Sequence, residues 1–344
     1  MKRNIMSFIC MSIVMAFLFT SCGKRATKKD HVSHQVNQNT NVSESDHSNA
    51  DASVVYFTED ISAEGLVKIY EQLGWQPTGK VAVKISTGEP PASNYLRPEL
   101  IGTLVQQLHG TIVECNTAYG GSRSSSAMHK QVAEDHGFTA IAAFDLMDED
   151  GEMNLPVTVP DGMKQHLKED VVGSHFANYD SYLILSHFKG HAMAGFGGAI
   201  KNISIGIASP KGKSLIHTGG KSASNPWGGN QTDFTESMAE AGKAVSDYLG
   251  NGERIVYINV MNRLSVDCDC DGNPAEPDIH DIGILASFDP VALDQACVDL
   301  VYNAEGNASL VRRIESKNGI HTLEHAEAIG LGNRSYNLVN IDKQ

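Results

Sequence analysis

The sequence predicts an α/β protein in which a mostly parallel sheet has helices on both faces. From Ser53 onward, short runs of β-branched residues alternate with amphipathic stretches. Several of these runs are apolar at nearly every position, which is typical of strands covered on both faces. The amphipathic stretches begin at helix-capping residues. Strand and helix repeated in this order favour parallel pairing, and ligands bind such sheets at the loops that follow the carboxyl ends of strands.

The predicted elements follow from these patterns in chain order. The expected strands are VVYFT (54–58), KVAVKIS (80–86), TIVEC (111–115), TAIAAF (139–144), SYLILS (181–186), RIVYINV (254–260) and DIGILAS (281–287). Helices are expected after the caps Ser62, Pro98, Thr232 and Asp289-Pro290. Gly74, Gly110 and Gly250 are expected to end three of the helices.

Composition excludes several classes of protein. The 344 residues are 41% hydrophobic and 20% charged, enough for a large core, so the chain is not wholly disordered, collagen-like or a polytopic membrane protein. The net charge of −14 repels nucleic acid, and no nucleic-acid partner is expected. Six cysteines are too few for a disulfide scaffold.

The first 52 residues are expected to target and tether the protein. Lys2 and Arg3 precede an uncharged run and the sequence Ser21-Cys22-Gly23, which resembles a bacterial lipoprotein signal peptide over residues 1–22. The alternative, a single membrane-spanning anchor, requires about 20 apolar residues, more than this run offers. We expect acylation of Cys22, a flexible polar linker over 23–52, and an α/β domain over 53–344 that is anchored to a membrane and faces the periplasm or the outer surface.

The loop NTAYGGSR (116–123) is the first candidate for ligand binding. It follows an expected strand and leads into a helix that begins near Ser124. Free backbone N–H groups at a helix N-terminus attract anions, and an arginine adds positive charge. Asn116, Tyr119 and Arg123 are therefore candidate ligand-binding residues, although a tight turn with a serine cap explains the same pattern.

The segment HFKGHAMAGFGGAIKNISIG (187–206) is the strongest candidate site. In an extended segment, His187, Lys189 and His191 lie on one side, and in a helix the two histidines still share a face. The three are candidate catalytic residues: a histidine as general base or metal ligand, and the lysine as charge stabiliser or base. Lys201 and Asn202 are further candidate ligand-binding residues. Satisfied loop histidines are the plainer alternative.

The acidic loop DCDCDGNPAEPDIHD (267–281) permits several chemistries. Cys268 and Cys270 are candidate ligands of a transition metal, completed by His187 or His191. The second alternative is a disulfide between them, which an exported protein could form, although so small a ring would be strained and easily reduced. The carboxylates also resemble a calcium loop, with candidate ligands Asp267, Asp269, Asp271 and Asp278, but Pro274 and the preceding strand disfavour an EF-hand. A solvated acidic loop is the remaining alternative.

Five stretches resemble the domain of unknown function 362 family of bacterial and archaeal proteins. They are VAVKISTGEPPASNYLRPELI (81–101), ECNTAYGGSRSSSAMHKQVAEDHGF (114–138), LSHFKGHAMAGFGGAIKNISIGIAS (185–209), DCDCDGNPAEPDIHDIGILASFDPVALDQACVDLV (267–301) and LEHAEAIGLGNRSYNLV (323–339). The resemblance implies an iron–sulfur association, because many members carry a ferredoxin-like cysteine run after the stretch matching 199–206. No cysteine lies between Cys115 and Cys268, so we expect no ferredoxin-type cluster here.

These patterns lead to three functional hypotheses. The first is an envelope lipoprotein whose pocket, lined by histidine, lysine and cysteine, binds a metal or a small anionic ligand, with or without catalysis. The second is a non-catalytic lipoprotein that binds a ligand or a partner. The third is a thiol redox protein that uses Cys268 and Cys270. The first hypothesis requires that segments 187–191 and 268–270 meet at one edge of the sheet.

Overall fold

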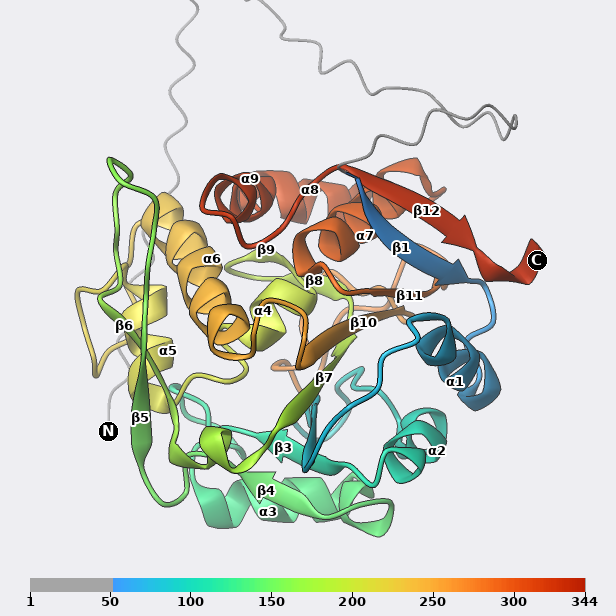
Figure 1. Ribbon diagram of the computed structural model, residues 1–344, viewed down its shortest axis with the longest axis horizontal. Coiled ribbons are helices and arrows are strands. Elements are labelled where there is room, and N and C mark those ends of the chain that lie inside the picture. The colour runs from blue at the N-terminus through green and yellow to red at the C-terminus, as the bar shows by residue number, and fades with distance from the viewer. Residues whose placement is uncertain (1–51, 344) are drawn as a thin grey trace, which may run out of the picture. The chain divides into compact units, whose positions relative to one another are not determined.

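An eight-stranded sheet lies at the centre of the computed structural model, which describes residues 52–343 (Figure 1). Its strands, in spatial order, are β12 (Tyr336–Asn340), β1 (Ser53–Thr58), β11 (Gly283–Ser287), β10 (Ile255–Met261), β7 (Ser181–His187), β2 (Val81–Lys84), β3 (Thr111–Glu114) and β4 (Phe144–Leu146). Only β11 runs antiparallel to its neighbours. The mostly parallel sheet confirms the predicted fold class.

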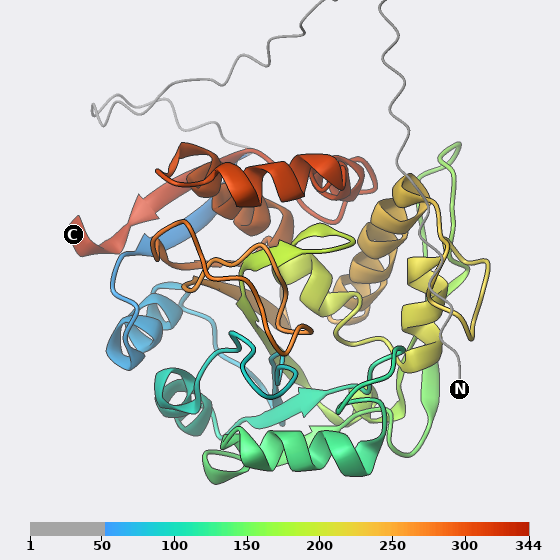
Figure 2. The same cartoon turned by 180° about the vertical axis from the view of Figure 1, so that it is seen from behind.

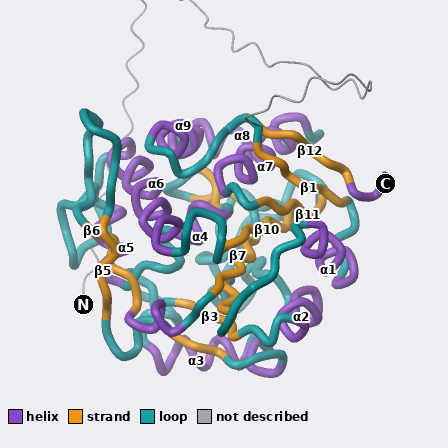
Figure 3. Tube along the Cα trace, in the orientation of Figure 1, coloured by secondary structure: helices purple, strands orange, loops and turns teal. Residues whose placement is uncertain are grey.

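Two small hairpins stand apart from this sheet, and Figure 3 separates their strands from the loops that join them. One pairs β5 (Glu152–Pro156) with β6 (Glu169–Gly173), and the other pairs β8 (Lys189–His191) with β9 (Gly195–Gly197). The second hairpin shows that the 187–191 segment is extended. Its side chains therefore alternate as predicted.

Helices cover both faces of the sheet (Figures 1 and 2). The α-helices are α1 (Ala63–Gln72), α2 (Pro98–Gln107), α3 (Ser126–Asp135), α4 (Ala199–Ile203), α5 (Pro210–His217), α6 (Gln231–Tyr248), α7 (Pro290–Asn303), α8 (Ala308–Ser316) and α9 (Ile320–Ala328). Short 3-10 helices lie at Phe138–Ala140, Ser174–Asn178 and Ile341–Lys343.

The alternation along β7 explains why this strand is apolar throughout. Leu183 and Leu185 join a core cluster with side chains of α1 and α2. Tyr182 and Ile184 point to the opposite face and join the cluster that contains α4, α6 and α7. A strand buried on both faces needs apolar residues at odd and even positions alike.

Most predicted helix starts agree with the structure, and one is wrong. Ser62 accepts a hydrogen bond from Gly65 N, and Asp289 caps α7. The helix expected after Thr232 begins at Gln231, because Asn230 is its cap and accepts hydrogen bonds from two backbone N–H groups of the first turn. Asparagine is the stronger capping residue of the two.

The strand predicted at 139–144 is also wrong. Gly137 adopts φ +83°, and the chain then forms a 3-10 turn that buries Phe138. The chain enters the sheet only at β4, a three-residue edge strand. A left-handed glycine and a tight turn thus outweigh the local β propensity of TAIAAF.

The predicted signal peptide, most of the linker and Cys22 lie outside the described residues. Within the part of the chain that the structure describes, no helix combines the length and the apolar character needed to cross a membrane. The domain boundaries at 22 and 52 therefore stay predictions.

Candidate functional site

A cavity of about 100 Å³ lies at the carboxyl ends of β2, β3 and β7. The loop after β10 forms part of its wall and meets the loop after β2, where Glu89 N donates to Asp269 O at 2.7 Å and Ala92 N donates to Gly272 O at 3.0 Å (Figure 2). Because the loop after β10 carries Cys268 and Cys270, it brings both cysteines to the edge where β7 ends. Parallel strands place their following loops at the same edge.

One side of the cavity is held by a buried ion pair between adjacent strands. Lys84 Nζ lies 2.7 Å from Glu114 Oε2 and also donates to Asn202 Oδ1 at 2.9 Å. Burial opposes ionisation of Glu114, but the charges of Lys84, His129 and Arg123 lower its pKa to about 2. Glu114 is therefore ionised. Burial lowers the pKa of Lys84, and the neighbouring Glu114 charge opposes this shift.

Arg123 is paired in the same way on the 116–123 loop. Its Nε lies 3.1 Å from Glu89 Oε2, and one terminal nitrogen donates to Tyr119 Oη at 2.8 Å. Glu89 also accepts a hydrogen bond from Ser122 N. Tyr119 and Arg123 line the cavity, whereas the Asn116 side chain turns to Ser126 and His129 and orients α3.

His187 and Lys189 meet the loop after β10 at Asp269. Asp269 Oδ1 lies 2.7 Å from His187 Nδ1, and Oδ2 lies 2.9 Å from Lys189 Nζ. Burial opposes ionisation of Asp269, yet these two partners hold its pKa well below the usual range. His187 Nε2 also faces Asn262 O at 2.6 Å, so neither ring nitrogen of His187 is unoccupied.

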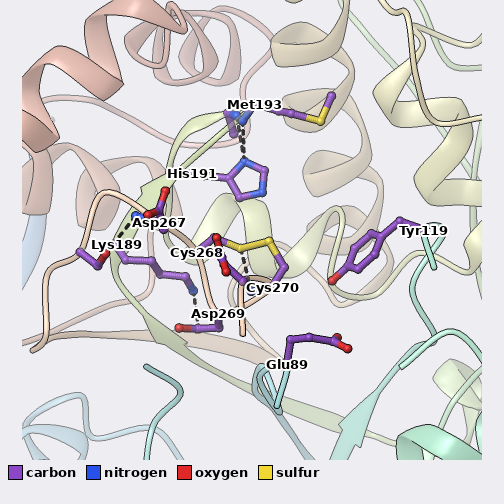
Figure 4. Close-up of a disulfide and its surroundings, with 12 residues drawn as sticks. Glu89, Tyr119, Lys189, His191, Met193, Asp267, Cys268, Asp269 and Cys270 are labelled. Carbon is purple, nitrogen blue, oxygen red and sulfur yellow. Dashed lines mark hydrogen bonds and ion pairs between the residues drawn. A yellow bond between two sulfur atoms is a disulfide. The ribbon is translucent and has the colours of Figure 1, made fainter. Parts of the chain in front are cut away.

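Cys268 and Cys270 form a disulfide on the cavity wall, next to His191 (Figure 4). The sulfur atoms and a ring nitrogen of His191 lie within 4.8 Å of one another. His191 Nδ1 accepts hydrogen bonds from Met193 N at 3.2 Å and Ala194 N at 2.9 Å. This geometry assigns the proton of the neutral imidazole to Nε2.

Lys201 reaches the cavity from α4 and differs from the other cations around it. Its amine makes no hydrogen bond or ion pair with any residue in the described range 52–343. Burial, followed by the nearby charge of Lys189, lowers the pKa of Lys201 to about 7. Burial, followed by the nearby charge of Lys201, holds the pKa of His191 well below its ordinary value.

The four carboxylates proposed as calcium ligands within residues 267–278 do not converge on one point. Asp269 is taken by His187 and Lys189, and the other three acidic side chains have separate partners: Arg313 for Asp267, Asn273 N for Asp271 and Ser309 for Asp278. A calcium ion needs six to eight oxygen ligands directed at one point. The residues of this loop do not fit that requirement.

Several cavity residues were missed by the sequence analysis, although the sequence carried a signal for two of them. Lys84 and Glu114 are lone charges at the ends of strands that are otherwise apolar, and a charge in a doubly covered strand requires a buried partner. Lys213 and His217 carry no such signal, since they lie on α5 in a polar stretch. Their place at the cavity depends on tertiary packing.

Fold and site together define an α/β protein with a cationic cavity at the carboxyl edge of a mostly parallel sheet. The chain belongs to the family described as Domain of unknown function (DUF362), which matches residues 81–299. This match confirms the resemblance found in the sequence. No curated protein matches the chain.

Solved structures with a similar fold are distant in sequence. One is the lactate racemase apoprotein from Thermoanaerobacterium thermosaccharolyticum, with 13% identity, a TM-score of 0.41, and coverage of 72% of this chain and 56% of that chain. Another is a structural genomics protein from Thermotoga maritima, with 13% identity, a TM-score of 0.38, and coverage of 78% and 58%. The match thus spans somewhat more than half the length of either protein.

Proposed function

We propose that the cavity binds a small organic anion. The observation that carries this proposal is the charge of its lining: five Lys and Arg side chains against one carboxylate, Glu114. Glu89 and Asp269 do not line the cavity but pair with two of these cations, and even when both are included the cations outnumber the carboxylates. The whole chain has a net charge of −14, so this local excess of positive charge runs against the overall balance. A cationic, partly enclosed site concentrates anions.

The cavity volume sets the size of the ligand. Sites for drug-sized molecules and nucleotide cofactors span about 300–1,000 Å³. A cavity of about 100 Å³ is smaller and fits an anion of a few carbon atoms. The Nε2–H of His191 and the amine of Lys201 supply donors for its oxygen atoms.

Calorimetric titration of the purified protein with oxalate tests the proposal. We expect saturable binding that Lys201→Met weakens at least tenfold, because the free cation is removed. Lys211→Met is the matched control, since Lys211 is exposed on the neighbouring helix α5 and pairs with Glu152. Equal affinity in all three proteins contradicts the proposal, as does the absence of binding to the wild-type protein.

A transition metal is the second candidate ligand, favoured by the proximity of His191, Cys268 and Cys270. In the disulfide form these residues do not fit a metal, because the sulfurs are bonded to each other and His191 Nδ1 accepts two hydrogen bonds. Reduction supplies two thiolates, which are ligands for soft and borderline metals. The metal site therefore requires a dithiol and a new position for the imidazole.

Cobalt(II) titration of the anaerobically reduced protein tests this candidate. Thiolate coordination gives a charge-transfer absorption band, which we expect to disappear in Cys268→Ser and to weaken in His191→Ala. Cys297→Ser is the control, since this buried thiol lies on α7 outside the cavity. A spectrum that is the same with and without reduction excludes the metal site. A separate count of reactive thiols before and after reduction tests the redox hypothesis.

We also propose that the protein is an envelope lipoprotein acylated at Cys22. The support is the sequence pattern of residues 1–22 and the polar stretch that follows it. Metabolic labelling with an alkyne fatty acid in a bacterial host tests the proposal. Labelling and membrane association that are lost together in Cys22→Ser support it, and labelling retained in that variant contradicts it.

A further inference from the structure

The amine of Lys201 is exceptional among the lysines of the cavity. Lys84 is bound by Glu114, Lys189 by Asp269, and Lys213 donates to Ala208 O. Lys201 has no such acceptor among the described residues, although it lines the same space. An unpartnered amine in a cavity is available to a ligand, and an amine without its proton is a nucleophile.

The surrounding backbone holds Lys201 in this position. Gly198 precedes α4, and the Asp294 carboxylate accepts hydrogen bonds from Ala199 N at 2.8 Å and Ile200 N at 2.9 Å. A Cβ at Gly198 would lie 2.3 Å from an Asp294 oxygen, so this close approach requires glycine. The start of α4 is thereby fixed to α7.

Gly197 provides the surface over which two lysine side chains lie. A Cβ built at Gly197 would be 3.1 Å from Lys201 Cδ and 3.7 Å from Lys189 Cε. The side chains of Lys189 and Lys201 therefore pass close together. The Lys189 amine is paired with Asp269, and the Lys201 amine is unpaired. A cation next to a second amine disfavours protonation of that amine, as does burial, and both effects agree with a Lys201 pKa of about 7.

We propose that Lys201 forms a covalent imine with small 2-oxo carboxylates. This inference rests on the proposed function: the positive potential of the cavity attracts the carboxylate of the substrate, His191 Nε2–H donates to it, and the Lys201 amine meets its carbonyl carbon. The neutral amine forms a C–N bond as the carbonyl π bond breaks, and the proton of the amine moves to the oxygen. Uptake of one further proton from solvent releases this oxygen as water and leaves the iminium ion. Glyoxylate and pyruvate are the simplest members of this class.

Reductive trapping tests the inference. The purified full-length protein is incubated at pH 7 with glyoxylate and sodium cyanoborohydride, which reduces the imine to a stable secondary amine. Peptide mass spectrometry then locates the adduct. We expect near-stoichiometric modification of Lys201, at least tenfold above any exposed lysine, and protection by oxalate. Lys201→Arg is expected to lose this adduct, and the wild-type peptide map serves as an internal comparison should that variant fold poorly.

Parallel calorimetry with oxalate, which has carboxylates but no ketone or aldehyde group, separates two kinds of failure. Oxalate binding without an adduct on Lys201, or with adducts spread evenly over exposed lysines, overturns the imine and leaves the anion site intact. Absence of both binding and adduct overturns the imine and the proposed function together. An adduct on Lys201 that oxalate prevents supports both.

Discussion

Two sides of one cavity use buried charge in different ways. The paired side, formed by Lys84, Glu114, Arg123 and Glu89, joins every cation to a carboxylate of the same chain. The open side, formed by Lys201, His191 and the Cys268–Cys270 disulfide, carries an amine, that of Lys201, which makes no hydrogen bond or ion pair with any described residue. The paired side is therefore assigned to stability and the open side to a ligand. Substitution of equivalent lysines on the two sides should separate these roles.

The largest expected effect is on the paired side. Lys84→Met leaves the Glu114 carboxylate buried without its main partner, and we expect the free energy of unfolding to fall by about 3–5 kcal/mol. Chemical denaturation at pH 7 measures this loss. Lys80→Met, at an exposed position just before β2, is the control and should change stability by less than about 0.5 kcal/mol. A loss for Lys84→Met as small as that of the control would show that the pair does not stabilise the fold.

The same substitution on the open side should have the opposite sign. The pKa of Lys201 is about 7 in the folded protein against an ordinary value of 10.5. Between these values the unfolded chain binds a proton that the folded chain lacks, so wild-type stability rises as the pH increases from 7 to 10. Lys201→Met removes this dependence and should stabilise the protein at pH 7 by up to roughly 4 kcal/mol. A destabilised variant, or parallel pH profiles for the two proteins, contradicts the assignment.

A smaller loss in the free energy of unfolding is expected where the open side is attached to the core. Asp294 is buried and caps α4, the helix that carries Lys201. Asp294→Asn places an amide donor against a backbone N–H, and we expect a loss of about 1–2 kcal/mol together with weaker oxalate binding. Thermal melting and calorimetry measure the two effects. Asp271→Asn, which removes the same charge at an exposed position, should change neither.

The smallest expected effect is the pH dependence of anion affinity. Lys201 is mostly protonated below its pKa of about 7 and mostly neutral above it. An anion that binds the protonated form should lose about tenfold in affinity between pH 6 and pH 8. Lys201→Arg keeps its charge over this range and should flatten the profile. Oxalate affinities that change equally in both proteins would assign the titration to another group.

The sequence predicted the sheet better than the site. The run SYLILS predicts a central strand because both faces of β7 are buried, and Asp289-Pro290 predicts the start of α7 from its local cap. The antiparallel direction of β11 was not predicted. It follows from the irregular loop 262–282, which replaces the helical crossover that a parallel strand requires.

Alternation along the chain did predict that His187, Lys189 and His191 share a side, and all three line the cavity. Alternation could not predict which of these side chains already has a hydrogen-bond or ion-pair partner. Asp269, which the sequence suggested as a calcium ligand, instead pairs with His187 and Lys189. This pairing could not be predicted, because Asp269 and His187 are 82 positions apart and meet only in the folded chain. Lys201 is distinctive because it lacks such a partner, and that lack is a property of tertiary structure.

Whether the open side binds an anionic ligand can be decided by measuring the ionisation of Lys201 with and without an anion. Competitive labelling with acetic anhydride over a range of pH, followed by peptide mass spectrometry, gives the apparent pKa of this one amine. We expect a Lys201 pKa of about 7 in the free protein. Saturating oxalate should raise this pKa by at least one unit, because a bound anion stabilises the ammonium form. A pKa near the ordinary lysine value in the free protein, or one that oxalate leaves unchanged, would contradict the assignment of the open side to an anionic ligand.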